Sequence, residues 1–202
     1  MTMFAEKTKL QFPEAVRWTR DDCNALEKAG CLNYRYELIE GVIYKLSQNY
    51  RHGGMIIAII LWLVKLFGKE FVLSQTSIDV RPEDNPTSEP MPDAIVMHDS
   101  FNSLVSNPKA NQILFCFEVS DSTLDYDLYS KAGLYARAGI PEYWVIDIPG
   151  RKLHVHRNPS EGEYQSITVH TESEFVSLLS KPEARAQISE FLPNLKSDSR
   201  MF

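Results

Sequence analysis

The feature of the sequence that most constrains the fold is a nearly continuous apolar run at residues 113–119, which contains a single carboxylate, Glu118. A short apolar run of this kind is typical of a central strand that is covered on both faces of its sheet. A carboxylate buried in such a strand is costly unless it is paired or binds a cation. The run therefore predicts a buried sheet, and it singles out Glu118 as a candidate functional residue.

The rest of the sequence alternates between helical and strand-like patterns, which are separated by glycines, prolines and turn-forming pairs. We predict helices at residues 21–29, 52–67 and 124–138, with a short helix near 182–191. We predict a hairpin at 34–46 and strands at 71–80, 93–97, 113–119, 142–148, 153–157 and 164–169. This order favours an α/β fold in which a mixed β-sheet is flanked by helices.

Length and composition are those of one ordinary globular domain. The chain has 202 residues, of which 44% are hydrophobic and 24% are charged, and this is enough apolar material for a real core. We expect residues 1–33 to form a helical extension of the same domain as residues 34–202. The net charge of −6 argues against broad adhesion to nucleic acid. It does not exclude a nuclease, because a bound divalent cation changes the local charge.

Three features favour a cytoplasmic protein without a membrane segment. The three cysteines form no CxxC pair and suggest no disulfide framework, which fits a reducing compartment. Residues 1–12 lack the pattern of a signal peptide. The longest apolar stretch, residues 55–64, ends at Lys65 and is expected to be too short to span a bilayer.

A second carboxylate can be brought close to Glu118. Asp93 follows a proline-rich loop and opens a predicted strand. The two acids are 25 residues apart, a distance that a hairpin with a loop can close. Two neighbouring carboxylates repel each other, and a divalent cation removes that cost. Hard oxygen ligands favour Mg²⁺ or Mn²⁺ over zinc, so we expect one of these two ions as the cofactor.

Strand alternation makes a further prediction about the face that carries Glu118. Side chains two residues apart lie on the same face of a strand. Ser120 is therefore expected on the same face as Glu118, together with Leu114 and Cys116.

An ammonium group follows on the next predicted helix. Lys131 and Tyr135 are four residues apart and share one helix face. Two carboxylates, a metal and a lysine make up a set that can cleave phosphodiesters. Each residue could also have a purely structural role. Asp93 could cap a loop, Glu118 could pair with a structural cation, and Lys131 could be a solvated helix residue.

Three segments carry a resemblance to a known family. The sequences PMPDAIVM, FEVSDSTLDYD and KAGLYARAGIPEYWVID occupy residues 90–97, 117–127 and 131–147. They resemble the Uma2 family of restriction-endonuclease-like proteins in the PD-(D/E)XK nuclease superfamily. The resemblance runs from about residue 34 to residue 157, and its most specific part is 118–147.

The resemblance implies roles for individual residues. Asp93 matches the metal-binding aspartate and Glu118 the second metal-binding acid. The lysine of the superfamily usually lies two residues after that acid, where this chain has Ser120. In sequences that resemble Uma2, a lysine of the next helix takes its place, and Lys131 fits that position.

Three other residues are weaker candidates. Glu37 matches an acidic position of the family and could complete the site, although alternation could also point it outward from the hairpin. His52, before the long helix, matches another recurrent position of the family and could also be a plain surface residue. Gln75 lies on a predicted strand and could help to fix a ligand.

These residues lead to one main functional hypothesis and two alternatives. The main hypothesis is a Mg²⁺- or Mn²⁺-dependent endonuclease that hydrolyses DNA, acting as a monomer or a homodimer. The first alternative is a nuclease fold that binds nucleic acid or another partner without cutting. The second is a metal-dependent hydrolase of a small phosphodiester.

Overall fold

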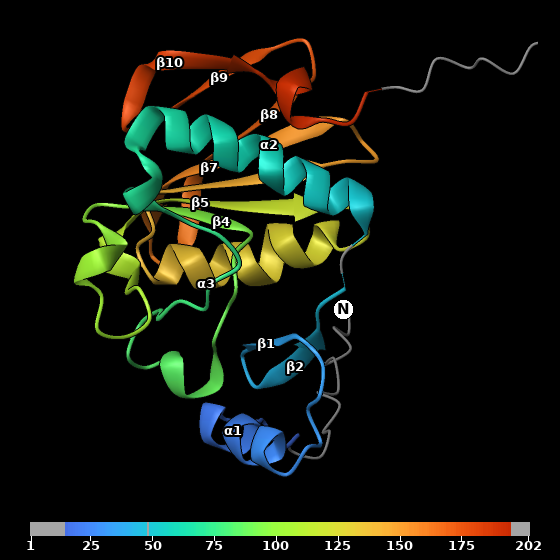
Figure 1. Ribbon diagram of the computed structural model, residues 1–202, viewed down its shortest axis with the longest axis vertical. Coiled ribbons are helices and arrows are strands. Elements are labelled where there is room, and N and C mark those ends of the chain that lie inside the picture. Colours follow the sequence, from blue (N-terminus) through green and yellow to red (C-terminus); the bar gives the residue numbers. More distant parts are fainter. Residues whose placement is uncertain (1–14, 48, 195–202) are drawn as a thin grey trace, which may run out of the picture.

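A six-stranded sheet forms the centre of the molecule (Figure 1), with the strand order β3-β4-β5-β6-β7-β8. The computed structural model describes residues 15–47 and 49–194. The expectations for residues 1–12 therefore lie outside the described residues. The strands of the sheet are β3 (Val72–Leu73), β4 (Ala94–Met97), β5 (Ile113–Ser120), β6 (Glu142–Asp147), β7 (Lys152–Ser160) and β8 (Glu163–Thr171).

The sheet is mixed, and β5 lies in its interior. β5 is antiparallel to β4 and parallel to β6, and the other pairings of the sheet are antiparallel. Nearly every residue of β5 is buried, as expected for a strand covered on both faces. The predicted α/β fold with a mixed sheet between helices is confirmed.

One face of the sheet is covered by α2 (Tyr50–Phe67) and by a hairpin of β9 (Phe175–Leu178) and β10 (Lys181–Gln187) (Figure 1). The side chain of Asn49 caps α2 by accepting two backbone N–H groups of its first turn, and Gly68 ends the helix. The core on this face joins Ile56, Ile59 and Leu63 of α2 to Phe115, Phe117, Val119 and Trp144 of the sheet.

The length of α2 corrects one expectation. The helix has 18 residues with a mean hydropathy of 1.4, so by length and composition alone it is long and apolar enough to cross a bilayer. The expectation that this segment is too short was therefore wrong, because the helix extends beyond both ends of the apolar run. In the structure Ile59 and Leu63 are buried against the sheet, whereas Ile57 and Leu61 are exposed.

The opposite face of the sheet is covered by a π-helical segment, Tyr126–Lys131, which continues directly into α3 (Ala132–Arg137). Gly139, with a φ of +78°, follows the end of α3 and gives the left-handed conformation common at helix ends. The helix expected at 124–138 is present, but its π-helical part was not predicted. The core on this face includes Cys116, Tyr135, Tyr143 and Val145.

A second hairpin lies apart from the central sheet (Figure 1), formed by β1 (Tyr36–Ile39) and β2 (Val42–Lys45). Glu40 and Gly41 form its turn, both with positive φ, as the favoured two-residue hairpin turns require. α1 (Arg20–Lys28) lies beside this hairpin (Figure 1). The hairpin and the first helix therefore agree with the prediction.

Two predicted elements differ from the structure. Only Val72 and Leu73 of the strand expected at 71–80 pair with the sheet, because Gln75 adopts a φ of +49° and turns the chain away. Residues 182–191 form most of β10 and a 3₁₀ turn, Ile188–Phe191, in place of a short helix. The alternation of buried residues at the end of this segment, Ala186 and Ile188, is typical of an extended chain.

A bulge in β5 corrects the predicted face of Leu114. Val96 pairs with Phe115 and Met97 with Ile113, so one extra residue stands in β5. Leu114 consequently packs with the core under α2. Cys116 packs on the opposite face, which is the face expected for Glu118.

Candidate active site

Asp93 and Glu118 meet at the end of the β4–β5 pair. Ala94 is registered with Phe117, so the preceding residue Asp93 stands opposite Glu118, and residues opposite each other in antiparallel strands point to the same face. Oδ2 of Asp93 also accepts the backbone N–H of Val119 at 2.8 Å. Both carboxylates are buried. The β4–β5 pairing therefore brings together the two acids expected to bind metal.

Lys131 reaches Glu118 from the last turn of the π-helical segment. Its Nζ lies 2.8 Å from Oε1 of Glu118, and its side chain is only 4% exposed. The hydroxyl of Tyr135 donates to the same oxygen at 3.1 Å. A π-helical turn within an α-helix is rare and frequent at functional sites. Lys131 is thus a buried ion-pair partner of Glu118. The alternative that Lys131 is a solvated helix residue is wrong.

Glu37 completes this cluster from the β1–β2 hairpin. The alternative that its side chain points outward from the hairpin is also wrong, because Glu37 is buried. Oε1 of Glu37 lies 3.0 Å from Nζ of Lys131 and accepts the hydroxyl of Tyr126 at 3.1 Å. Oε2 accepts the backbone N–H of Met91 at 3.1 Å. Glu37 therefore ties the hairpin both to Lys131 and to the loop that leads into Asp93.

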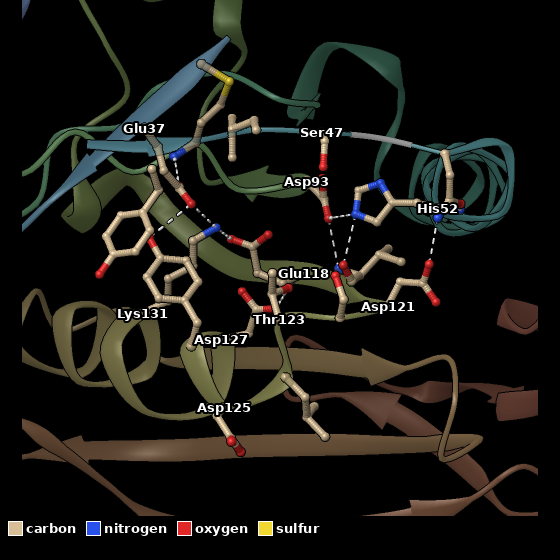
Figure 2. Close-up of a pocket in the computed structure, with 18 of the residues that line it drawn as sticks. Glu37, Ser47, His52, Asp93, Glu118, Asp121, Thr123, Asp125, Asp127 and Lys131 are labelled. Carbon is tan, nitrogen blue, oxygen red and sulfur yellow. Dashed lines mark hydrogen bonds and ion pairs between the residues drawn. The ribbon is translucent and has the colours of Figure 1, made fainter. Parts of the chain in front are cut away.

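His52 approaches the acids from the first turn of α2 (Figure 2). Its Nε2 lies 2.9 Å from the carbonyl oxygen of Val119 and 3.2 Å from Oδ2 of Asp93. Burial lowers the pKa of this imidazole, but the hydrogen bond and the charge of Asp93 outweigh burial and raise the pKa overall. An N–H held between two oxygens shows that this position attracts positive charge.

The two remaining candidates lie at the edge of the cluster. Nε2 of Gln75 is 3.4 Å from Oδ1 of Asp93, a weak contact made from a loop and not from a strand. Ser120 is buried, and its hydroxyl lies 3.4 Å from that of Thr123. Ser120 therefore points toward the loop after β5, beside Thr123. Burial raises the pKa of Asp127 in this region, and hydrogen bonds from Thr123 and Ser120 oppose that rise.

The cluster forms the floor of a pocket with a volume of about 930 Å³. The hairpin β1–β2, the first turn of α2 and the loop after β5 form its walls (Figure 2). Acidic residues of the lining outnumber its lysines and arginines, and the acids are Glu37, Asp93, Glu118, Asp121, Asp125, Asp127 and Asp147. A pocket with this excess of negative charge is suited to a cation.

The ionisation of Glu118 reflects this crowding. Burial raises the pKa of Glu118 well above its usual value, the charge of Lys131 opposes that rise, and the charge of Asp93 adds to it. Burial alone would lower the pKa of Lys131, but Glu118 and Glu37 outweigh it and raise the pKa well above the usual value. Lys131 therefore stays charged, and one ammonium faces more carboxylate charge than it can neutralise.

The oxygens that could hold a divalent cation are the carboxylates of Asp93 and Glu118 and the carbonyl of Val119. All three are hard donors, which suit Mg²⁺ and Mn²⁺. Within the described residues, no group of three or more His, Cys, Asp or Glu side chains is arranged to hold a metal ion. The fit therefore depends on two carboxylates that meet, one backbone oxygen and the excess negative charge of the pocket.

Sequence reasoning missed three partners in this site. Asp127 is not among the residues predicted for the site, but it is buried in the pocket wall and accepts the hydroxyl of Thr123 at 2.8 Å. The Tyr126 hydroxyl and the Val119 carbonyl were not considered. Burial of an aspartate carries no sequence signal of its own, although DYD at residues 125–127 lies inside one of the segments that resemble the family.

Comparisons with known proteins bear on the family and the fold of this chain. The model of the Uma2 family, described as "Putative restriction endonuclease", matches residues 26–189. A crystal structure from Anabaena variabilis, described as "a putative nuclease belonging to DUF820", is similar to this chain with a TM-score of 0.59. The two sequences are 15% identical, and the alignment covers 82% of this chain and 96% of that one, so this likeness shows the fold.

No curated protein matches the sequence of this chain. The match to the family model nevertheless spans both predicted metal-binding acids, the lysine and most of the chain. The resemblance stated from three short segments is therefore confirmed over a longer range. This chain belongs to the Uma2 family of restriction-endonuclease-like proteins.

Proposed function

We propose that the protein is a Mg²⁺- or Mn²⁺-dependent endonuclease that hydrolyses phosphodiester bonds of DNA. The observation that carries the proposal is the convergence of Asp93 and Glu118 with Lys131 on the floor of one pocket. Two acids and a lysine are the residue types that metal-assisted phosphodiester hydrolysis needs. Membership of a restriction-endonuclease-like family supports the same reaction class.

The residues of the pocket divide the work as follows. Asp93 and Glu118 would hold the cation, which supplies positive charge to the phosphate and lowers the pKa of a bound water. Lys131 fixes the orientation of Glu118 through its 2.8 Å contact and places an ammonium where negative charge develops during the reaction. Tyr135 holds the same carboxylate oxygen, and burial raises the pKa of its hydroxyl, so it stays a donor.

Glu37 acts through Lys131. It lies 3.0 Å from the ammonium and is fixed in turn by Tyr126 and by the backbone N–H of Met91. Glu37 is therefore a positioning residue in this proposal. It keeps Lys131 in place and leaves the acids at the β4–β5 end to bind the cation.

The test is cleavage of supercoiled plasmid with Mg²⁺ or Mn²⁺, followed on agarose gels. We expect wild-type protein to produce nicked and linear DNA, and EDTA to stop the reaction. Glu118→Gln should abolish cleavage, whereas Glu163→Gln, an exposed acid at the start of β8, should leave it unchanged. Equal cleavage by wild type and Glu118→Gln, with circular dichroism showing that both are folded, would defeat the proposal.

A second candidate function is a nuclease fold that binds nucleic acid without cutting it. The observation that favours it is that Oε1 of Glu118 already accepts both Lys131 and Tyr135, which occupies one of its two oxygens. Titration calorimetry with Mn²⁺ separates the two functions. Equal Mn²⁺ affinity of wild type and Asp93→Ala would support the non-catalytic protein, and tighter binding by wild type would support the nuclease.

A further inference from the structure

Arg35 differs from Lys131, the buried cation of the pocket, and shares the lining with one other exposed cation, Lys45, whose ammonium lies over the Tyr34 ring. Lys131 is buried between two carboxylates, whereas Arg35 lines the pocket from the start of the hairpin and is exposed to solvent. Within the described residues, no carboxylate lies within ion-pair distance of its guanidinium. Arg35 instead donates to Oε1 of Gln75 at 3.2 Å and contacts Sδ of Met91 at 3.2 Å.

Most other arginines of the described chain have a carboxylate partner. These pairs are Arg20–Asp79, Arg81–Glu83, Arg137–Glu40, Arg151–Glu172 and Arg157–Glu142. A guanidinium presents a planar set of donors that matches the oxygens of a phosphate. Arg35 thus offers uncompensated positive charge on the wall of an otherwise acidic pocket.

The position of Arg35 relates it to the proposed reaction. Gln75 accepts from Arg35 with its oxygen and faces Oδ1 of Asp93 with its nitrogen at 3.4 Å. Gln75 therefore lies between Arg35 and Asp93. Arg35 is beside the proposed metal site and does not contact Asp93.

We propose that Arg35, oriented by Gln75 and Met91, binds the phosphate next to the one that is cleaved in a DNA strand. The inference rests on the proposed nuclease function and names its substrate class, because a small phosphodiester has no second phosphate for Arg35 to hold. The pocket volume of about 930 Å³ lies near the upper end of the range for small-molecule sites and leaves space beyond a single phosphate.

The first test measures binding without cleavage. Fluorescence anisotropy of a labelled DNA duplex in EDTA gives the Kd of wild type, Arg35→Gln and Arg185→Gln at several salt concentrations. Arg185 is the matched control, since it is an exposed arginine that lies over the Phe175 ring and lies outside the pocket lining.

We expect Arg35→Gln to raise the Kd about tenfold or more, as for a lost charge-assisted hydrogen bond. The slope of log K against log salt should become shallower by about one, and Arg185→Gln should change neither quantity. Absence of DNA binding by wild type, or equal Kd and slope for wild type and Arg35→Gln, overturns the inference.

The second test compares two substrates in Mn²⁺. Arg35→Gln should raise the KM for DNA and leave the hydrolysis of bis(p-nitrophenyl) phosphate unchanged, because that compound carries one phosphate. Equal loss on both substrates assigns Arg35 a general structural role and overturns the inference. If wild type cleaves neither substrate, the proposed nuclease function fails, and the binding measurement in EDTA alone decides the role of Arg35.

Discussion

The Nζ of Lys131 lies 2.8 Å from Oε1 of Glu118, and both side chains are almost completely buried. Glu37 approaches the same ammonium at 3.0 Å, so one positive charge serves two carboxylates. Removing one partner of a buried ion pair is costly, because the remaining charge is left uncompensated. The stability of the cluster therefore depends on Lys131 more than on either carboxylate.

Lys131→Met should lower the free energy of unfolding by about 3–5 kcal/mol at neutral pH. The loss should shrink as the pH falls, because Glu118, whose pKa is raised by burial, then becomes protonated and no longer needs a counter-charge. Urea unfolding at several pH values measures both effects. The double variant Lys131→Met, Glu118→Gln should recover part of the loss, and a single variant as stable as wild type would show that the pair is unimportant.

Metal binding should weaken as the pH falls, and it should do so at a higher pH than for an ordinary glutamate. Burial and the charge of Asp93 raise the pKa of Glu118, and a cation needs the ionised carboxylate. Binding should therefore release protons in mildly acidic solution. Calorimetry of Mn²⁺ binding in buffers of different ionisation enthalpy counts these protons, and an affinity that is constant from neutral pH to pH 5 would contradict the expectation.

His52 should stabilise the metal-free protein only at lower pH. Its pKa is raised in the folded state by Asp93, although burial opposes the rise. The stabilisation is therefore fully present below the unfolded pKa of about 6.5 and is lost as the pH rises through the folded pKa. We expect the difference in unfolding free energy between wild type and His52→Gln to be larger at pH 5.5 than at pH 9, with EDTA present. A difference independent of pH would be the opposite result.

Glu37→Gln should slow the proposed cleavage more than it weakens substrate binding. The variant keeps the size of the side chain but removes one of the two charges that hold Lys131. Misplacement of a reacting group by a small distance can reduce turnover strongly, so kcat should fall about tenfold or more while KM changes little. Steady-state kinetics decide this, and a change confined to KM would place Glu37 at the substrate-binding surface.

Much of the fold could be predicted, because the pattern of apolar residues within each short segment indicates whether the segment is a helix or a strand. The apolar run at 113–119 predicted β5, and the glycines at 68 and 139 predicted where α2 and α3 end. The bulge at Leu114 could not be predicted, since it depends on how β4 pairs with β5. The strand expected beyond Leu73 failed because Gln75 adopts a positive φ, which residues other than glycine rarely do.

The residues of the candidate site were easier to name than to position. The resemblance and the residue types pointed to Asp93, Glu118 and Lys131 before any contact was known. The contact between Glu37 and Lys131 joins residues 94 positions apart, and the π-helical turn that brings Lys131 inward has no local pattern. The positions of the site residues therefore depend on long-range contacts and on the geometry of the π-helical turn, which local sequence patterns do not reveal.

The central claim is that Asp93 and Glu118 hold one divalent cation in this pocket. Diffraction data from crystals soaked in Mn²⁺, collected where manganese scatters anomalously, test it most directly. We predict an anomalous peak in contact with both carboxylates in wild type and its loss in Asp93→Asn. Density at some other place, or none in the wild-type crystals while the protein remains folded and the pocket open, would contradict the account.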